Sequence, residues 1–508
     1  MDNAVETKRS FYFYGLSIAA CGVFFDFSMI STILAYIERD LQSTYALQLV
    51  MILNVLVMGS FLVLTGRIAD RFGKKRFMII ALLLFAAGSV GVALSFDAQF
   101  MIFFRALQGL ANAMIISISL SFIHSMFSKD QRMHRVTIWS AMASLGLVLG
   151  PIVGGTIINW ISWRYSLISD VVIAFYALGI LIYAGSSVEE ERSDTPMDWR
   201  GFFLLLIFLI AITIAIVFGP VWGWHYYVIH LMILTSIISF FLFWIVEKKQ
   251  KYAIIPFHFF PNKIFVGSFI GNFALFFLIA SEFFFLPLFL QNMTNLPTYI
   301  VGLLIAPLSL FVLIVSPSIG KIVKATNMKI LVLAGFAMFM LTAAVQLYSH
   351  SFFFVLAGIF CCAIAWSLSF IPLQRTTFYT LPEKFSKMIL QGFFTINAIG
   401  GTIGIAFTGA VFRLGETMMI KSLLDQNNLF MTEKEVHLVK RSLFNLTQAQ
   451  EILNYFTSGR GKEFIFIFQR GFLSGFDWVN WVILSIAFMT LIIIGSLFFL
   501  KKSSFDLR

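Results

Sequence analysis

Apolar residues along this chain fall into blocks of about 20, the length at which an α-helix crosses the hydrocarbon core of a bilayer. Short polar stretches separate the blocks, and 59% of the 508 residues are hydrophobic. The pattern predicts an all-α integral membrane protein with fourteen spanning helices, an even number that places both termini on one side. The expected spans are 11–36, 46–66, 77–96, 99–127, 136–160, 163–185, 199–219, 226–246, 264–291, 299–320, 329–349, 352–376, 387–412 and 478–500.

Charged residues make up only 12% of the chain, whereas about 25% is usual in a soluble domain. This composition excludes a soluble enzyme and a disordered protein, and the loops leave no room for a catalytic domain. We expect a carrier rather than an enzyme, with no catalytic residue, cofactor or metal. The sequence lacks a P-loop, which argues against ATP-driven transport. Its cysteines, Cys21, Cys361 and Cys362, lie in apolar blocks without the spacing of a metal site.

The formal net charge of +11 has a topological explanation. Cytoplasmic loops of membrane proteins collect Lys and Arg, and most of these residues fall in the tails and loops that share a side with the termini. Examples are the basic runs at 74–76 and 248–251. We therefore expect cytoplasmic termini in the cytoplasmic membrane, and no nucleic-acid partner.

The polar segments divide the chain into four parts. Residues 413–477 form a predicted long outer loop of mixed charge, in which Thr432 and Glu435 have capping-box spacing. Amphipathic runs at 435–444 and 463–473 favour helices lying on the membrane surface. A structural loop and a lid or docking segment both remain open. The four parts are a six-helix bundle (1–185), an acidic cytoplasmic linker (186–198), two extra helices (199–246), and a second six-helix bundle containing the outer loop (247–508).

A glycine, acid and base pattern follows the second span, formed by Gly66, Asp70, Arg71, Gly73 and Lys74. This spacing resembles the inner-loop signature of the major facilitator superfamily. Gly66 lets helices approach closely and Gly73 permits a tight turn. Asp70 is placed to meet the positive N-terminal end of a helix in the other half of the molecule, which we expect near residues 386–390. Such a contact would latch one conformation shut from the inside.

A degraded copy of the same pattern begins at Gly320, after the tenth span, with Lys324 in place of the acid and Asn327 in place of the second glycine. A repeat at matching points of two halves fits a two-bundle transporter. The departures suggest that only the first copy keeps an acid-mediated latch.

The fifth span carries a glycine-rich motif made of Gly146, Gly150, Pro151, Gly154 and Gly155. Small residues four apart allow contact between helix backbones, and a proline kinks a helix. The full pattern resembles the antiporter signature of the superfamily. That resemblance implies export coupled to proton entry.

The first span carries Asp26 between aromatic residues, with Phe25 before it and Ser28 after it. It is similar to the first-span motif of the fourteen-span drug:proton antiporters, although Phe25, Ser28 and Ala35 replace the leucine, threonine and proline of that motif. A carboxyl group in hydrocarbon favours its neutral form, which suits a proton carrier. A fixed structural ion pair is the alternative interpretation.

The fourth span places Arg105, Gln108 and Asn112 on one helical face. An arginine inside a bilayer should face a polar cavity or a partner. Asp170 and Glu282 depart from the usual family pattern, and with Asp26 and Arg105 they are expected in the outer half of the bilayer, where one cavity could contain all four. Glu282 could instead lie solvated at the interface.

The resemblance implies a major facilitator fold with two six-helix bundles and two inserted helices. It implies proton-coupled export of small lipophilic or cationic compounds, with Asp26, Arg105, Asp170 and Glu282 in proton coupling. Phe25, Ser28, Gln108 and Asn112 are expected to line the substrate cavity. Alternatives are a dedicated exporter of a metabolite or siderophore, a proton-coupled importer, and a membrane scaffold or sensor. The expected partners are a small-molecule substrate, protons and the bilayer. A monomer is expected, and a periplasmic adaptor with an outer-membrane channel remains open.

Overall fold

The computed structural model describes residues 2–41, 46–185, 196–250, 253–255, 257–294, 296–322, 328–379, 386–427, 429 and 460–499, and the ordered elements in these ranges are all helices. They are α1 (Asp2–Leu41), α2 (Ala46–Phe72), α3 (Lys74–Ala93), α4 (Ala98–Met126), α5 (Lys129–Trp160), α6 (Trp163–Ser166), α7 (Ile168–Gly185), α8 (Trp199–Trp222), α9 (Tyr227–Lys249), the short 3₁₀ helix η1 (Phe257–Phe259), α10 (Lys263–Thr294), α11 (Thr298–Ile305), α12 (Pro307–Ile322), α13 (Met328–Tyr348), α14 (Phe352–Tyr379), α15 (Ser386–Gln426) and α18 (Arg460–Phe499).

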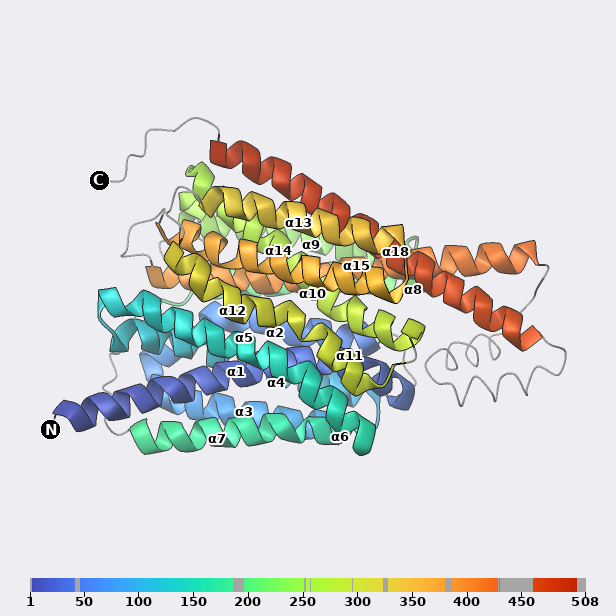
Figure 1. Ribbon diagram of the computed structural model, residues 1–508. Helices are drawn as coiled ribbons and strands as arrows, with labels where there is room; N and C mark the ends of the chain where they lie inside the picture. Colours follow the sequence, from blue (N-terminus) through green and yellow to red (C-terminus); the bar gives the residue numbers. More distant parts are fainter. Residues whose placement is uncertain are drawn as a thin grey trace.

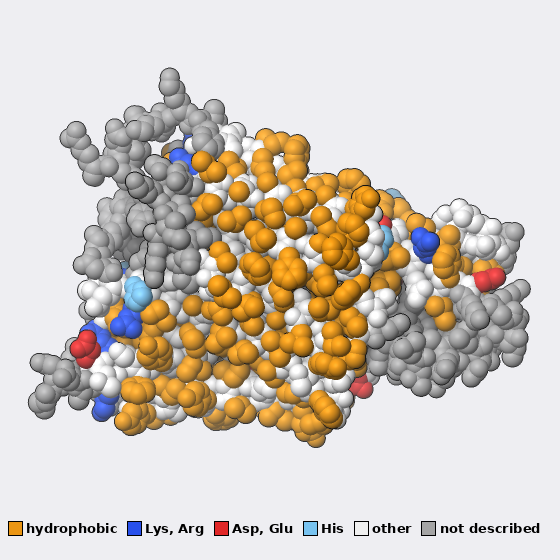
Figure 2. Space-filling view, viewed as in Figure 1, with side chains coloured by type: hydrophobic (Ala, Val, Ile, Leu, Met, Phe, Trp, Pro, Cys, Tyr) orange, Lys and Arg blue, Asp and Glu red, His pale blue; other side chains and the backbone are white. Residues whose placement is uncertain are grey.

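The described residues contain 14 segments long and apolar enough to cross a membrane. This confirms the predicted number of spans and the all-α fold class. The long helices lie side by side, and α1 begins at the same end of the molecule at which α18 ends (Figure 1). We call this the terminal end. Hydrophobic side chains cover the middle of the visible face, and charged side chains gather toward its ends (Figure 2).

The helices form two bundles with the same pattern of neighbours. In the N-terminal bundle α1 packs against α5 and α7, α2 packs against α4, and α3 packs against α4 and α7. In the C-terminal bundle α10 packs against α15 and α18, α12 packs against α14, and α13 packs against α14 and α18. The second bundle therefore repeats the first helix by helix, as in transporters built from two structural repeats.

The two inserted helices, α8 and α9, pack against each other, and α8 also contacts α2 and α15. The carboxylate of Asp198 begins α8 by accepting a hydrogen bond from the Gly201 N–H at 2.9 Å. Outward-facing apolar residues such as Leu234 and Ile238 are exposed on α9, as expected for a surface that meets lipid tails.

The region predicted as a long outer loop is largely helical where the structure describes it. α15 continues to Gln426 and α18 begins at Arg460, and the two helices project beyond the bundles at the end opposite the termini (Figure 1). We call this the hairpin end. Phe464, Ile467 and Phe468 are buried against apolar residues of α15. These contacts explain why both helices extend past the membrane-spanning length.

The predicted loop boundaries, residues 413 and 477, both fall within helices. The run 463–473 is helical, as predicted, but it forms part of α18 instead of a separate helix lying on the membrane surface. The run 435–444, together with Thr432 and Glu435, lies outside the described residues.

The tenth span, expected over 299–320, comprises two helical segments. α11 ends at Ile305 and α12 begins at Pro307. Proline has no backbone N–H to donate to the preceding turn, but it suits the first position of a helix. The turn between α2 and α3 agrees with prediction, because Gly73 there has a positive φ of 117°.

Candidate functional site

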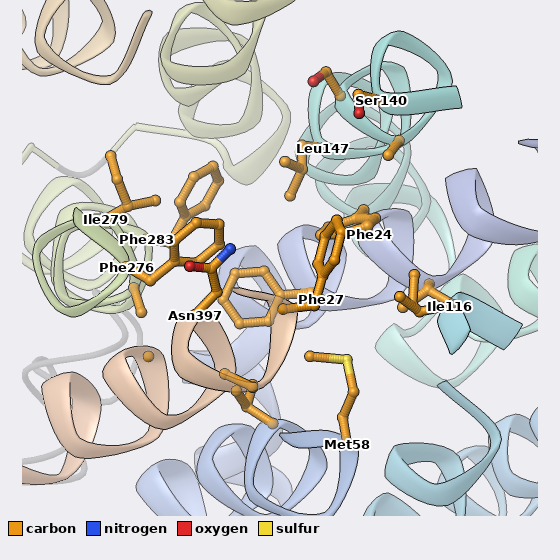
Figure 3. Close-up of a pocket in the computed structure, with 18 of the residues that line it drawn as sticks. Phe24, Phe27, Met58, Ile116, Ser140, Leu147, Phe276, Ile279, Phe283 and Asn397 are labelled. Atoms are coloured by element: carbon orange, nitrogen blue, oxygen red, sulfur yellow. The ribbon is translucent and has the colours of Figure 1, made fainter. Parts of the chain in front are cut away.

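A cavity lies between the two bundles. The space free of protein atoms in this region, which includes space open to solvent, is about 1030 Å³. The lining comes from α1, α2, α4 and α5 on one side and from α10, α14 and α15 on the other. Figure 3 shows Phe24 and Phe27 of α1 opposite Phe276 and Phe283 of α10. Both bundles therefore shape this space.

The cavity is closed toward the hairpin end by contacts between the bundles. The Gln291 side chain donates to the Thr32 carbonyl at 2.6 Å, and the hydroxyls of Thr298 and Tyr36 lie 2.8 Å apart. Cavity residues on α5, such as Ser140, lie in the half of that helix nearer the terminal end. The space therefore extends from the middle of the bundles toward the terminal end.

Asp26 and Arg105 form an ion pair inside the N-terminal bundle. Nη1 of Arg105 donates to both carboxylate oxygens of Asp26 at 2.8 Å, and neither side chain is exposed. Arg105 Nε donates to the Val50 carbonyl at 3.0 Å, and Nη1 also donates to Gln108 Oε1 at 2.8 Å. These partners stabilise an arginine that hydrocarbon alone would exclude.

Asp170 joins the same polar cluster through two neutral side chains. Gln108 Nε2 donates to Ser89 Oγ at 2.8 Å, and Ser89 Oγ donates to Asp170 Oδ2 at 3.5 Å. Asp170 is fully buried, and Asp26 and Arg105 are its charged neighbours. With both groups ionised, the three side chains Asp26, Asp170 and Arg105 would carry a net charge of −1, so one bound proton makes the trio neutral.

This cluster lies behind the cavity wall. Phe24 and Phe27 line the cavity, whereas Asp26 faces the interior of the N-terminal bundle. Each residue of an α-helix is turned by about 100° from the one before it, because one turn contains about 3.6 residues. Phe27 therefore faces the cavity, whereas the adjacent Asp26 faces the interior of the bundle, where it pairs with Arg105.

Four residues that the sequence predicts in the cavity lie elsewhere. Phe25, Ser28, Gln108 and Asn112 are not among the described residues that line it. Gln108 belongs to the polar cluster, and Asn112 donates to Asn54 Oδ1 at 3.1 Å. Phe25 and Ser28 lie where α1 meets the glycines of α5. These four residues do not line the cavity because the faces of α1 and α4 that carry them pack against other helices of their own bundle.

The antiporter motif lies where α5 meets two other helices. A Cβ added to Gly146 would meet the Cys21 carbonyl of α1, and one added to Gly150 would lie 2.6 Å from the Phe25 carbonyl. A Cβ on Gly154 would lie 2.8 Å from the Met29 side chain.

The end of the motif faces the other bundle. A Cβ on Gly155 would lie 2.5 Å from the Thr298 carbonyl of α11, and one on Gly302 of α11 would meet the Pro151 carbonyl. The glycines thus allow direct backbone contact of α5 with α1 and with α11.

The predicted latch motif lies at the terminal end of α2. Ser121 donates to Asp70 Oδ1 at 2.7 Å, and Lys74 Nζ lies 3.6 Å from the same oxygen. A Cβ on Gly66 would lie 2.5 Å from Gln391 Nε2 of α15, so α2 and α15 approach closely there. The side chains of residues 386–388 and of Lys324 and Asn327 lie outside the described set. The contact of Asp70 and Arg71 with the start of α15 stays a prediction.

Glu282 lies in the C-terminal bundle, apart from the other three predicted proton-coupling residues. Its exposed fraction is 2%, so the alternative of a solvated carboxyl at the interface is wrong. Gln346 of α13 and Cys362 of α14 are its electrostatic neighbours. Helix α10 occupies the place in its bundle that α1 occupies in the other, so the two acids lie on corresponding helices and each faces its own bundle.

Sequence reasoning missed the polar residues that do line the cavity, which include Asn54, Asn397, Trp139 and Trp366. Asn54 and Asn397 each interrupt an apolar block, and that is the signal that could have revealed them. The helix face that each one presents depends on tertiary packing, which the linear pattern does not contain.

Residues 16–405 match the family model of the Major Facilitator Superfamily. The multidrug resistance protein Stp of Mycobacterium tuberculosis (strain CDC 1551 / Oshkosh) is 27% identical over 73% of this chain and 71% of that protein. The multidrug transporter protein MdtP of Bacillus subtilis (strain 168) is 24% identical over 80% and 76%. The probable multidrug resistance protein EmrY of Escherichia coli (strain K12) is 25% identical over 72% and 73%.

Two solved structures share the fold. A bacterial homologue of the human lysosomal transporter Spinster, in an inward-facing and occupied conformation, aligns over 98% of this chain and 99% of that chain with a TM-score of 0.67 and 13% identity. The peptide transporter POT in complex with sulfate aligns over 97% and 96% with a TM-score of 0.61 and 15% identity. At these identities the likeness concerns the fold alone.

Proposed function

Because the chain belongs to the Major Facilitator Superfamily, we propose that it exports small lipophilic or cationic compounds from the cytoplasm in exchange for protons. Its relatives bear the names of multidrug resistance proteins and transporters, and family membership makes the chain a membrane transporter rather than an enzyme. The observation that carries the proposal is the buried cluster of Asp26, Arg105 and Asp170 between the helices of one bundle.

The charge balance of this cluster supports proton coupling. Two carboxyl groups share one guanidinium, and removing an uncompensated charge from water is costly. A single proton neutralises the trio, and its release restores a net charge of −1. Binding from the outside and release to the inside would return the carrier to the state that accepts cargo. Glu282 is a candidate for a second proton site in the other bundle.

Alternating access is supported by the way the bundles meet. The glycines of α5 let it contact both α1 and α11 through backbone atoms, so a change at Asp26 on α1 can alter the contact between bundles. The Asp70 motif would act at the opposite end as the latch. In this proposal both termini are cytoplasmic, and the cavity that extends toward the terminal end accepts cargo from the cytoplasm.

Two alternatives use the same fold. A dedicated exporter of one metabolite or siderophore would share the cluster and differ in its range of substrates. A proton-coupled importer would accumulate its substrate in intact cells, and the resemblance of the α5 motif argues for the opposite direction. We propose a monomeric carrier, and co-purification from membranes would show whether a periplasmic adaptor is recruited.

Proton movement in energised everted vesicles tests the proposal. A compound that is exported should collapse the pH gradient in vesicles with the wild-type protein, and Asp26→Asn should abolish this effect. Asp97→Asn is the matched control, because Asp97 accepts a hydrogen bond from the Phe100 N–H at the start of α4 and asparagine caps helices equally well. Substrate-dependent gradient collapse that persists in Asp26→Asn would contradict the role of the cluster.

A further inference from the structure

The walls of the central cavity are mainly aromatic. Phe27 of α1 and Phe283 of α10 meet edge to face across the bundles, with ring centroids 6.0 Å apart. Phe283 in turn meets Trp366 at 5.9 Å in the same geometry. On the N-terminal side Trp139 packs edge to face with Phe394 at 5.8 Å. These rings provide flat apolar surfaces that suit a ligand with fused or linked rings.

Unpartnered polar atoms interrupt these walls. Both amide atoms of Asn397 lack a hydrogen-bond partner, as do the indole N–H groups of Trp139 and Trp366. The Asn54 side-chain oxygen accepts a hydrogen bond from the Asn112 amide, whereas the Asn54 NH₂ group has no hydrogen-bond partner. All four side chains are more than nine-tenths buried and line the cavity, and Figure 3 shows the Asn397 amide among the aromatic rings.

These unpartnered atoms are mostly hydrogen-bond donors. Asn54, Trp139 and Trp366 offer N–H groups, and Asn397 offers one NH₂ group and one oxygen. Buried donors are costly when they have no partner. These atoms have almost no accessible surface in this conformation, so a ligand that brings carbonyl or ether oxygens into the cavity would satisfy them once the neighbouring side chains rotate aside.

The described lining contains no Asp, Glu, Lys, Arg or His. Asp26 is paired with Arg105 behind Phe24 and Phe27, and Glu282 is not among the described lining residues. A charged ligand would therefore lose its hydration without gaining an opposite charge. Aromatic faces attract cations. In an edge-to-face pair, however, the edge of one ring covers the face of the other, so the attraction of the remaining faces would replace only part of the lost hydration of a cation.

We propose that this cavity binds uncharged, polycyclic or otherwise flat lipophilic molecules that carry hydrogen-bond acceptors such as ketone or quinone oxygens. This inference rests on the proposed export function and specifies its cargo. Proton and cargo then occupy separate sites on different faces of α1. Each exchange cycle moves one net charge for each proton, because the cargo carries none.

Equilibrium binding to the full-length protein in nanodiscs tests the cargo class without any proton gradient. The probes share one ring system: 2-acetylanthracene is the neutral acceptor, 2-ethylanthracene lacks the oxygen, anthracene-2-carboxylate is the anion, and an anthracenylmethyl-trimethylammonium salt is the cation. Empty nanodiscs correct for partition into lipid. We expect the ketone to bind about tenfold more tightly than each of the other three, the gain that one buried hydrogen bond can supply.

The matched variants are Asn397→Leu and Asn480→Leu. Asn480 of α18 is also buried with both amide atoms unpartnered, but it is not among the described lining residues. Asn397→Leu should remove the preference for the ketone over the hydrocarbon, and Asn480→Leu should keep it. Tighter binding of the cation, or equal effects of the two variants, would overturn the proposal.

The two claims can fail separately. If the ketone preference depends on Asn397 but the Asp26→Asn protein still couples transport to protons, the cargo class stands and the coupling proposal fails. If coupling requires Asp26 but the cation is the preferred ligand, the coupling proposal stands and the proposed cargo class fails.

Discussion

Removal of Arg105 should destabilise the protein far more than removal of another arginine that also pairs with an aspartate. Arg105 is fully buried and donates to both oxygens of Asp26 at 2.8 Å. Removing one partner of a buried pair costs about 3–5 kcal/mol, because the other charge stays buried. Arg105→Gln leaves two such carboxyl groups, Asp26 and Asp170, without the guanidinium.

Arg164→Gln is the matched control. Arg164 pairs with Asp40, but the two side chains are 36% and 44% exposed, and exposed pairs contribute at most about 1 kcal/mol. Asp26→Asn should fall between the two, at about 1.5–3 kcal/mol for a lost hydrogen bond to a charged group, because Asp170 remains to compensate Arg105.

The assay is unfolding of the purified full-length protein in mixed micelles across a range of pH. The Arg105→Gln variant should regain stability as the pH falls, since protons replace the missing positive charge at the carboxyl groups. The Arg164→Gln variant should show no such recovery. Equal losses in the two variants, or a loss in Arg105→Gln that does not change with pH, would refute the account of the cluster.

Two further predictions concern local packing. Gly150→Val should abolish transport, because its Cβ would lie 2.6 Å from the Phe25 carbonyl, whereas Gly179→Val should be tolerated because nothing lies within 4 Å of the added atom. Transport assays at matched expression compare the two variants, and equal activity would contradict the packing argument. Glu247→Ala should speed hydrogen exchange at the Ile254 amide, which donates to Glu247 Oε2 at 2.8 Å. Glu247→Gln keeps an acceptor, so the Ile254 amide should exchange more slowly in this variant than in the alanine variant. Indistinguishable exchange rates would show that this hydrogen bond does not hold the segment.

Much of the fold could be predicted from sequence because hydrocarbon imposes a strict rule. Every span must satisfy its backbone hydrogen bonds internally and present apolar side chains to lipid, so the apolar blocks mark the helices. The pairing of Asp26 with Arg105 was also predictable, since an intramembrane arginine requires a partner. The glycine at position 73 indicated the tight turn in which it is found.

The predictions that failed depend on tertiary contacts. Phe25 and Phe27 are two residues apart and equally apolar, yet only Phe27 lines the cavity, because α5 covers the other face of α1. Glu282 has the same chemical signature as Asp26 and lies in the second bundle, as the sequence predicts, but the face of α10 that carries it is set by tertiary packing. The extension of α18 depends on Phe464 and Phe468 packing against α15, a contact between segments that are distant in sequence.

The most direct test of the central claim separates movement of the carrier from proton coupling. In everted vesicles preloaded with unlabelled substrate, labelled substrate should enter by counterflow in both the wild type and Asp26→Asn, because substrate exchange requires no net proton transfer. With an imposed pH gradient and no preloading, only the wild type should accumulate substrate above its equilibrium level. Gradient-driven accumulation by Asp26→Asn equal to that of the wild type would contradict the claim that this buried cluster carries the proton.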